Sequence, residues 1–509
     1  MNFGTWDWVA HYASTQPNAP ALRNLENGET RTWRELDERV GKIAHLLLNE
    51  WALKPGSRIA NLSNGDLRHF DMQFACIRAG MIWVPLNFRQ TVLELSALCR
   101  NLMPAVMLAD AAWSDAAAGV VAEADIPRSL LWGQGEAFDI AIEAAPCLSA
   151  CDHMIDPHVP MQILFTSGTT GEPKAVAYTL SGLTFQVLNQ LEFCATQAAD
   201  NHIYVPIPLF HAGGLHAFAN PILFAGGQVT VSTRFVPETA VSFVGDPANH
   251  VTHLSLVPVM YQMMAECAAF PDADFSQVQR FSCAGGRLTQ SLLDAYGKKG
   301  VSFMTQYGGT ETGPTVTSMN PSRIDKIVAG SCGQKARFID VKLVDDAGED
   351  VPAGEPGEVW VRGPSITAGY MIGGELQPVD GWLKTGDIAI CDDEGFFFIV
   401  DRVKDMYKSG GENVFPAEVE RVLGEHPAVA EVAVIGVADD RWGEVGLAVA
   451  IARPGSTLSL EDLRAHCDGK IARFKQPHHL MLVDALPRNV TGKISKQELR
   501  VQFAGSKSA

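Results

Sequence analysis

The chain has 509 residues, of which 47% are hydrophobic and 19% are charged, and this composition is typical of a globular protein. Its length allows about two to four domains, each large enough to bury a core of its own. The 40 basic and 58 acidic residues give a formal charge of −18. Nucleic-acid binders and proteins attracted to anionic lipid need a positive field, so this charge argues against both classes.

The distribution of apolar residues and cysteines excludes further classes. Residues 1–16 are acidic and polar where a signal peptide needs an apolar core, and no apolar run approaches the ~18 residues of a membrane span. The ten cysteines are scattered and form no CxxC pair, so we expect neither a zinc site nor a disulfide framework. The sequence therefore predicts reduced thiols and a cytoplasmic location.

Over most of the chain, strand-like and helix-like segments alternate, which predicts a mostly parallel α/β body. A first helix pattern covers residues 93–98, and short apolar runs that predict buried strands follow at 162–165, 202–205 and 228–232. A second helix pattern lies at 292–296. Between 338 and 362, two alternating runs flank an acidic turn with a glycine, and this predicts an antiparallel β section.

The last part of the chain is denser in charge. Residues 401–509 carry 15 basic and 15 acidic residues, so the preceding residues carry the whole net charge. Pro416 predicts the start of a helix that buries Val419, Val422 and Leu423. A strand is expected at 429–435, and the spacing of Ser495 and Glu498 predicts a capping box that opens a last helix.

These patterns predict an α/β fold class with two domains. The large N-terminal domain, 1–401, would contain α/β layers and the added antiparallel β section. The small C-terminal domain, 402–509, would be α+β.

The segment Phe165-Thr-Ser-Gly-Thr-Thr-Gly-Glu-Pro-Lys174 is the most informative one. It follows a predicted strand, and its two glycines allow backbone N–H groups to turn toward an anion. The hydroxyls add donors, and the lysine adds a charge for phosphate. The order of its glycines and lysine differs from that of a Walker A loop. We expect a phosphate-binding loop formed by Thr166, Ser167, Gly168, Thr169, Thr170, Gly171 and Lys174.

Three further segments contain groups that could bind the rest of a nucleotide. In the glycine-rich segment 306–314, Tyr307 offers a flat face to a base and Glu311 offers oxygen to Mg²⁺. Asp387 could hold a ribose diol beside Arg402. Lys493 lies on a short loop before the last predicted helix. Taken alone, these segments have ordinary structural readings, namely a glycine-rich turn, a turn acid with a surface arginine, and a solvated lysine.

Together, the order and spacing of the four segments resemble the adenylate-forming superfamily of acyl-CoA synthetases, luciferases and peptide-synthetase adenylation domains. The resemblance runs from about Trp6 to Lys496 and includes residues 80–87 and 208–213. Residues 404–413 are most similar to the acyl-CoA ligase branch. The resemblance implies ATP-dependent adenylation of a carboxylic acid and then thioester formation with CoA. AMP and pyrophosphate would be released, with Mg²⁺ as the metal cofactor.

The resemblance also implies a role for each matching residue. The catalytic set would be Lys493, which bridges the carboxylate and the α-phosphate, Thr310 at the α-phosphate, Glu311 on Mg²⁺, and His211 as a gate. Thr170 would be a second metal ligand. The adenine and acyl pocket would be lined by Ala284, Gly285, Gly286 and Tyr307. Ribose would be held by Asp387 and Arg402, and Gly410 and Gly411 would lie beside the pantetheine tunnel. The small domain would be mobile about a hinge near 401–404, with Lys404 as the hinge residue.

The acyl pocket is expected among 211–217, 256–261, 283–287 and 308–316, where many residues are small. This favours an aromatic or medium-chain acid over one as small as acetate. Three positions depart from the family pattern: Ala175 replaces a frequent glycine, Arg287 a usual proline, and Lys408 a frequent apolar residue.

Several alternatives stay open. The enzyme could load a carrier protein instead of CoA, act as a luciferase-like oxygenase, or be a catalytically silent nucleotide-binding protein. The oligomeric state is also open, and a homodimer is one option.

Overall fold

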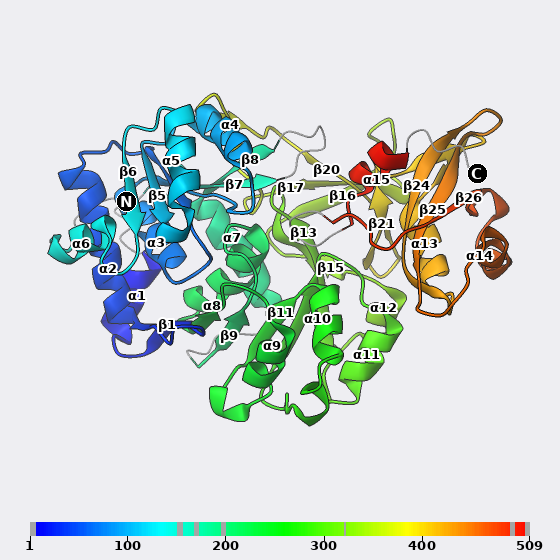
Figure 1. Ribbon diagram of the computed structural model, residues 1–509, viewed down its shortest axis with the longest axis horizontal. Helices are drawn as coiled ribbons and strands as arrows, with labels where there is room; N and C mark the ends of the chain where they lie inside the picture. The colour runs from blue at the N-terminus through cyan, green and yellow to red at the C-terminus, as the bar shows by residue number, and fades with distance from the viewer. Residues whose placement is uncertain are drawn as a thin grey trace. The chain divides into compact units, whose positions relative to one another are not determined.

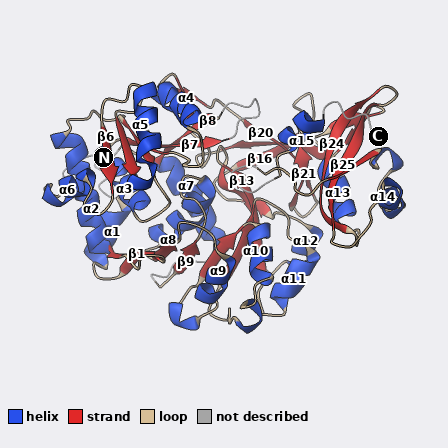
Figure 2. Cartoon of the chain, viewed as in Figure 1, coloured by secondary structure: helices blue, strands red, loops and turns tan. Residues whose placement is uncertain are grey.

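The structure is a computed structural model that describes residues 7–149, 156–166, 173–194, 200–319, 322–488 and 494–503. The chain divides into two compact units. The first unit contains Met1–Val341, Val361–Leu383 and Gly395–Phe397, and the second contains Lys342–Trp360, Lys384–Glu394 and Phe398–Ala509. Figure 1 follows the chain through both units, and Figure 2 shows how helices and strands alternate along it.

One sheet of the first unit has the strand order β19-β18-β8-β7-β4-β3-β5-β6 among the described residues. Its strands β3 to β7 run parallel, whereas β8 and β18 are antiparallel to their neighbours. The strands are β3 (Arg58–Leu62), β4 (Ile82–Pro85), β5 (Val106–Asp110), β6 (Ser129–Trp132), β7 (Pro160–Thr166), β8 (Lys174–Thr179), β18 (Gly369–Ile372) and β19 (Glu375–Pro378).

Helices cover both faces of this sheet, so most residues of its central strands are apolar. Ile59 of β3 packs in a core with α2 and α3, and the next residue, Ala60, packs in a second core with α4 and α5. The helices of this region are α1 (Trp8–Thr15), α2 (Trp33–His45), η2 (Leu46–Glu50), α3 (Arg68–Ala79), α4 (Val92–Leu102), α5 (Ser114–Glu123) and α6 (Ala137–Ala144).

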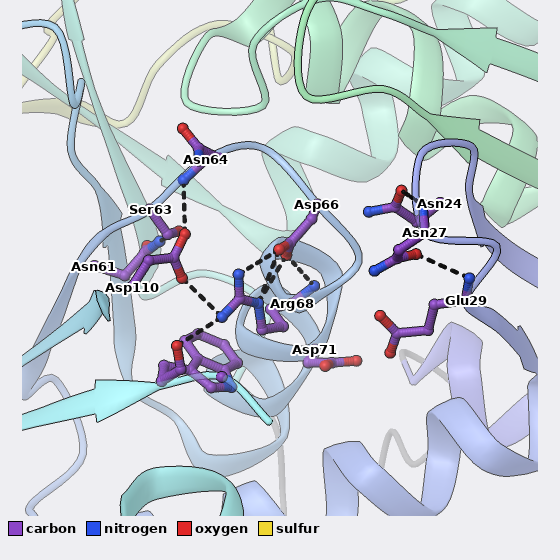
Figure 3. Close-up of polar contacts among 12 residues, drawn as sticks. Asn24, Asn27, Glu29, Asn61, Ser63, Asn64, Asp66, Arg68, Asp71 and Asp110 are labelled. Atoms are coloured by element: carbon purple, nitrogen blue, oxygen red, sulfur yellow. Dashed lines mark hydrogen bonds and ion pairs between the residues drawn. The ribbon is translucent and has the colours of Figure 1, made fainter. Parts of the chain in front are cut away.

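A partly buried polar cluster joins the start of α3, after β3, to the last residues of β5 and β6 (Figure 3). The Arg68 guanidinium pairs with Asp66 and with Asp110, at 2.7 Å from the latter, and donates to the carbonyl oxygen of Trp132. Burial raises the pKa of Asp110 to about 6, although the Arg68 charge opposes the shift. This cluster holds three strand ends together.

The other sheet of the first unit has the order β15-β14-β13-β12-β11-β9-β10-β1-β2. Strands β1 and β9 to β13 run parallel, and β2, β14 and β15 pair in antiparallel fashion. The strands are β1 (Pro20–Asn24), β2 (Thr30–Thr32), β9 (His202–Val205), β10 (Gln228–Val231), β11 (His253–Leu256), β12 (Arg280–Ala284), β13 (Phe303–Gly309), β14 (Gly313–Ser318) and β15 (Gln334–Lys335).

Helices follow the parallel strands of this second sheet as crossover connections. The helices α9, α10 and α11 lie side by side (Figure 1). The helices are α7 (Leu180–Cys194), η5 (Gly213–Ala219), α8 (Asn220–Phe224), α9 (Pro237–Val244), α10 (Pro258–Ala265), α11 (Gln290–Gly297) and α12 (Ile324–Ala329). The predicted mostly parallel body is therefore confirmed, with antiparallel strands at the sheet edges.

The second unit contains a sheet ordered β23-β22-β25-β24, with β26 on the other side of β25. Alternate residues of β24 enter two cores, because Val434 packs with α13 and α14 whereas Ala433 packs with α15. Its elements are β22 (Tyr407–Ser409), β23 (Glu412–Val414), α13 (Pro416–Gly424), β24 (Val429–Asp439), β25 (Gly443–Ala452), α14 (Leu460–Cys467), β26 (His479–Leu482) and α15 (Lys496–Phe503).

The predicted β section is present as two neighbouring strands of a four-stranded sheet, β16-β17-β20-β21. These strands are β16 (Asp340–Val344), β17 (Pro356–Arg362), β20 (Leu383–Cys391) and β21 (Phe397–Arg402). Two other local predictions are confirmed. Pro416 begins α13, and the amide of Glu498 donates to the Ser495 hydroxyl before α15. No helix in the described ranges has the length and apolar character needed to cross a membrane.

Candidate active site

The predicted phosphate loop connects the hairpin strands β7 and β8. Thr166 ends β7, Lys174 begins β8, and the two residues are register partners. Residues Ser167, Gly168, Thr169, Thr170 and Gly171 lie outside the described residues. The Lys174 ammonium lies 5.4 Å from the ring centroid of Tyr370 on β18, which gives its charge a fixed neighbour at the base of the hairpin.

Two hydrogen bonds join this hairpin to the turn between β13 and β14. The Thr166 hydroxyl donates to Oε1 of Glu311 at 3.0 Å. The Tyr178 hydroxyl, from β8, donates to the carbonyl oxygen of Thr310 at 2.6 Å. The structure therefore brings together Thr166, Thr310 and Glu311, which the sequence selected from segments more than 140 residues apart.

Tyr178 is a site residue that the sequence interpretation missed. Its ring is fully buried and lies 4.8 Å from the ring of His216. Burial, and then the negative charge of Glu311, raise the pKa of Tyr178 well above its ordinary value, so its hydroxyl keeps the proton that it donates. The only sequence signal was a tyrosine at a core-facing position of an apolar strand, which gives no indication of its partner.

The turn that carries Thr310 and Glu311 requires a glycine at position 308, where the chain passes close to the opposite strand. A Cβ on Gly308 would lie 2.4 Å from the backbone of Pro314 on the opposite strand. The turn is closed by the Gly309 amide, which donates to the Thr312 hydroxyl at 2.8 Å, and by the Thr367 amide, which donates to the Glu311 carbonyl oxygen. Tyr307 is half-buried on β13, immediately before this turn.

The small-residue segment follows β12, the strand next to β13. Ala284 is the register partner of Gln306, so it lies beside the residue that precedes Tyr307. Gly285 has a φ of 77°, which L-residues rarely adopt, and both it and Gly286 are exposed. The backbone here is therefore open to an approaching ligand.

Arg287, where the family pattern has a proline, has a structural partner. One of its terminal nitrogens donates to the carbonyl oxygen of Ala329 at 2.6 Å, at the end of α12. A cation at a helix C-terminus is favourable. The side chain also explains Gly330, because a Cβ there would lie 2.1 Å from Cζ of Arg287.

His211, the predicted gate, lies in the loop between β9 and η5. Its ring packs against Phe210 with centroids 4.8 Å apart. Burial, with a smaller effect of the Arg89 charge, lowers the pKa of His211 to about 4, so the imidazole is neutral near pH 7. Within the described part of the chain, its buried Nε2 has no hydrogen-bond partner.

In the second unit, Asp387 of β20 and Arg402 of β21 form an ion pair, with 2.9 Å between Oδ1 and Nε. The Arg402 side chain is half-exposed, so a carboxylate and a guanidinium are presented together at this edge. The preceding residue, Asp401, is buried and accepts a hydrogen bond from the Ala417 amide in the first turn of α13. Burial raises the pKa of Asp401, while nearby Lys496 opposes the shift.

The other predicted residues of the second unit lie on turns. Lys404 is exposed directly after β21, and its pKa is lowered by partial burial and by the Arg402 charge. Gly410 and Gly411 form the tip of the β22–β23 hairpin with φ of 60° and 90°, the conformation of a type I′ turn. Lys408 precedes this tip on β22 and faces Asn413, and nothing else in the structure explains it. Lys493 lies outside the described residues.

Among the described residues, no cluster of three or more His, Cys, Asp or Glu side chains could hold a metal ion. Glu311 is instead a single carboxylate beside a hydroxyl. The eight cysteines whose side chains are described are free thiols.

Known protein families, curated proteins and solved structures match most of the chain. The AMP-binding enzyme family model matches residues 9–371, and the model of the AMP-binding enzyme C-terminal domain matches 418–493. A feruloyl-CoA synthase of Amycolatopsis sp is 35% identical over 99% of both chains. An indoleacetate–CoA ligase of Aromatoleum aromaticum is 32% identical over 97% of both. The crystal structure of ATP-bound MatB from Rhodopseudomonas palustris superimposes with a TM-score of 0.89 at 26% identity, covering 99% of both chains. The chain therefore belongs to the AMP-binding enzyme family of the adenylate-forming superfamily.

Proposed function

We propose that this protein is an AMP-forming carboxylate–CoA ligase. A carboxylate oxygen attacks the α-phosphorus of ATP, and pyrophosphate leaves. The CoA thiol then attacks the acyl carbon of the adenylate, and AMP leaves. The observation that carries this proposal is the pair of hydrogen bonds that join the phosphate-loop hairpin to the Thr310–Glu311 turn.

Adenylation needs alignment and charge stabilisation rather than a covalent nucleophile. The hairpin and the turn supply hydroxyls, backbone N–H groups and the Lys174 charge for the phosphates. We assign Thr310 to the α-phosphate and Glu311 to Mg²⁺. This assignment suits Mg²⁺, which is bound by one or two carboxylates together with substrate phosphates. Thr170 would be the second ligand.

The open backbone at Ala284, Gly285 and Gly286 lies beside β13, so Tyr307 can lie against adenine while the glycines admit the acyl group. His211 is half-buried and its ring is neutral, and this suits a gate that changes rotamer without moving a charge. Single substitutions at Tyr307 and His211 would test the two roles independently.

In the second unit, we assign the Asp387–Arg402 pair to the ribose diol. Lys404 follows the pair on an exposed turn and would be the hinge residue. The rigid glycine tip at 410 and 411 would border the pantetheine of CoA, and Lys493 would bridge the carboxylate and the α-phosphate. We keep 1–401 and 402–509 as the proposed domains that move between the two half-reactions.

The substrate class that the relatives support is an aromatic carboxylic acid. Two relatives are named as ligases of feruloyl and indoleacetyl groups, and both align over almost the whole chain. The small residues at 284–286 and 308–309 leave room for a ring. A cytoplasmic location is proposed because ATP and CoA are cytoplasmic metabolites and the described cysteines are free thiols.

The test is a panel of aromatic and medium-chain carboxylic acids incubated with ATP and Mg²⁺, with and without CoA. We expect acid-dependent pyrophosphate exchange without CoA, and AMP release with an acyl-CoA product when CoA is added. Exchange without any thioester would instead support a carrier-protein acceptor. Nucleotide binding without exchange for any acid would support the catalytically silent alternative.

A further inference from the structure

A small cavity lies against the second sheet of the first unit, on the face covered by α7, η5 and α8. Its volume is about 10 Å³, which is about the room that one water molecule or one hydroxyl group needs. Its polar walls are Gln190, His253, Ser255 and Ser282, and Ala217 and Phe218 close it from η5. All six residues are buried.

The cavity lies on the same sheet face as the proposed acyl site. Residues two apart on a strand share a face, so Ser282 lies below Ala284 on β12, by about 6.6 Å at 3.3 Å per residue. Ser255 of β11 is the register partner of Ser282, and His253 is one further step down the same face. With increasing distance from Ala284, this face of the sheet therefore carries the hydroxyls of Ser282 and Ser255 and then the imidazole of His253.

Gln190 connects the cavity wall to the active-site edge. Its Nε2 donates to Oε1 of Gln306 at 3.0 Å, and Gln306 immediately precedes Tyr307. Gln306 is also the register partner of Ala284. Two links therefore connect the cavity to the proposed adenine and acyl pocket. One is the Gln190–Gln306 hydrogen bond, and the other is Ser282, which lies two residues before Ala284 on β12.

His253 lines this cavity, and one of its ring nitrogens has no hydrogen-bond partner among the described residues. Its Nδ1 lies 2.7 Å from the Thr252 hydroxyl, whereas no described residue gives its buried Nε2 a partner. The side chain is almost fully buried, and burial, helped by the charge of Arg280, lowers the pKa of His253 to about 3. The ring is therefore neutral, and Nε2 is a donor or an acceptor according to the tautomer.

We propose that this cavity is the far end of the acyl pocket, and that His253 Nε2 with Ser255 and Ser282 binds a neutral hydroxyl group on the ring of an aromatic acid. The proposal rests on the proposed function and specifies its substrate class. A hydroxyl can both donate and accept, so it satisfies Nε2 in either tautomer. A charged group would lose its hydration without a counter-charge, so the cavity selects against dicarboxylic acids and amino acids.

The experiment compares three pairs of acids that differ only in a ring hydroxyl: benzoate, phenylacetate and cinnamate, each with its 4-hydroxy derivative. The three lengths allow one pair to match the depth of the pocket. For that pair, we expect kcat/KM for pyrophosphate exchange to be about 10-fold higher for the hydroxylated acid. The acid without the ring hydroxyl leaves a buried polar group of the protein unpaired. His253→Leu should bring this ratio close to one, because the two acids of the pair then meet the same apolar wall.

Three variants make the result specific. His253→Gln retains a hydrogen-bonding side chain and should keep part of the preference. Ser282→Ala should lower the ratio, and it tests the same wall if His253→Leu does not fold. His158→Leu makes the same chemical change at an exposed histidine and should leave the ratio unchanged.

A ratio near one for every pair in the unaltered protein would overturn the proposal and would mean that the cavity holds only a buried water. A preference that survives both His253→Leu and Ser282→Ala would also overturn it. Pyrophosphate exchange with none of the acids would instead contradict the proposed function, and the two failures are therefore distinguishable.

Discussion

Tyr178→Phe removes one of the two hydrogen bonds that join the β7–β8 hairpin to the Thr310–Glu311 turn. Phenylalanine keeps the ring that packs against His216 and removes only the donor to the Thr310 carbonyl oxygen, a bond of 2.6 Å. Removing one partner of such a bond costs about 1–3 kcal/mol. Without this bond, Thr310 and Glu311 are held less well in place. If this raises the activation free energy of adenylation by about 1.4 kcal/mol, kcat/KM for adenylation falls about 10-fold.

The assay is acid-dependent pyrophosphate exchange without CoA, combined with the free energy of unfolding from urea titration. Tyr204→Phe is the matched control, because Tyr204 is also a buried strand tyrosine, and its hydroxyl lies 2.7 Å from that of Ser232. Both variants should lose about 1–2 kcal/mol of unfolding free energy. Only Tyr178→Phe should slow exchange. Equal slowing by both variants, or unchanged exchange in Tyr178→Phe, would refute the positioning role.

Three further predictions concern the stability at acid pH, the end of a helix and the proposed role of Lys493. Burial lowers the pKa of His69 to about 4, so the unfolded chain binds a proton that the folded chain does not between about pH 4 and 6.5. The contribution of His69 to the free energy of unfolding is therefore fully present above pH 6.5 and is lost as the pH falls toward 4. His69→Leu should reduce the slope of the unfolding free energy against pH in this range by about 1.4 kcal/mol per pH unit. Gly330→Ala should lower the unfolding free energy by about 1–2 kcal/mol, because φ is 89° and a Cβ would meet Arg287. Lys493→Ala should slow adenylation by a factor of about 10² to 10⁴.

Each of these predictions has a contradicting result. The His69 prediction is tested by urea titrations from pH 7 to pH 5. It is contradicted if the unfolding free energy of His69→Leu has the same slope against pH as that of the unaltered protein. The cost of Gly330→Ala should shrink in an Arg287→Ala background, so an equal cost in both backgrounds would show that the two side chains do not meet. Near-normal pyrophosphate exchange by Lys493→Ala would remove that lysine from the adenylation step.

Much of the fold follows from local sequence. The predicted strand at 202–205 coincides with β9, and Pro416 begins α13 because proline suits the first position of a helix. The strand patterns succeeded because both faces of these sheets are buried, so apolar runs mark the strands directly. Motif spacing also selected Thr166 and Glu311, which the structure places in hydrogen-bond contact.

Contacts between distant segments could not be read in the same way. Tyr178 and Thr310 are 132 positions apart, and their bond depends on how two sheets pack. The buried carboxylate of Asp401 reaches the first turn of α13, and Arg287 reaches the end of α12. In each case the sequence shows an ordinary side chain, and only tertiary packing supplies its partner.

The central claim is that the carboxylate of the acid attacks the α-phosphorus of ATP. It is tested most directly with an aromatic acid labelled with ¹⁸O in its carboxylate, incubated with the protein, ATP, Mg²⁺ and CoA. If an acyl-adenylate forms, the bridging oxygen comes from the acid and leaves with the nucleotide, so mass spectrometry should find one ¹⁸O in AMP. Label in inorganic phosphate together with ADP, or AMP without label, would contradict the account.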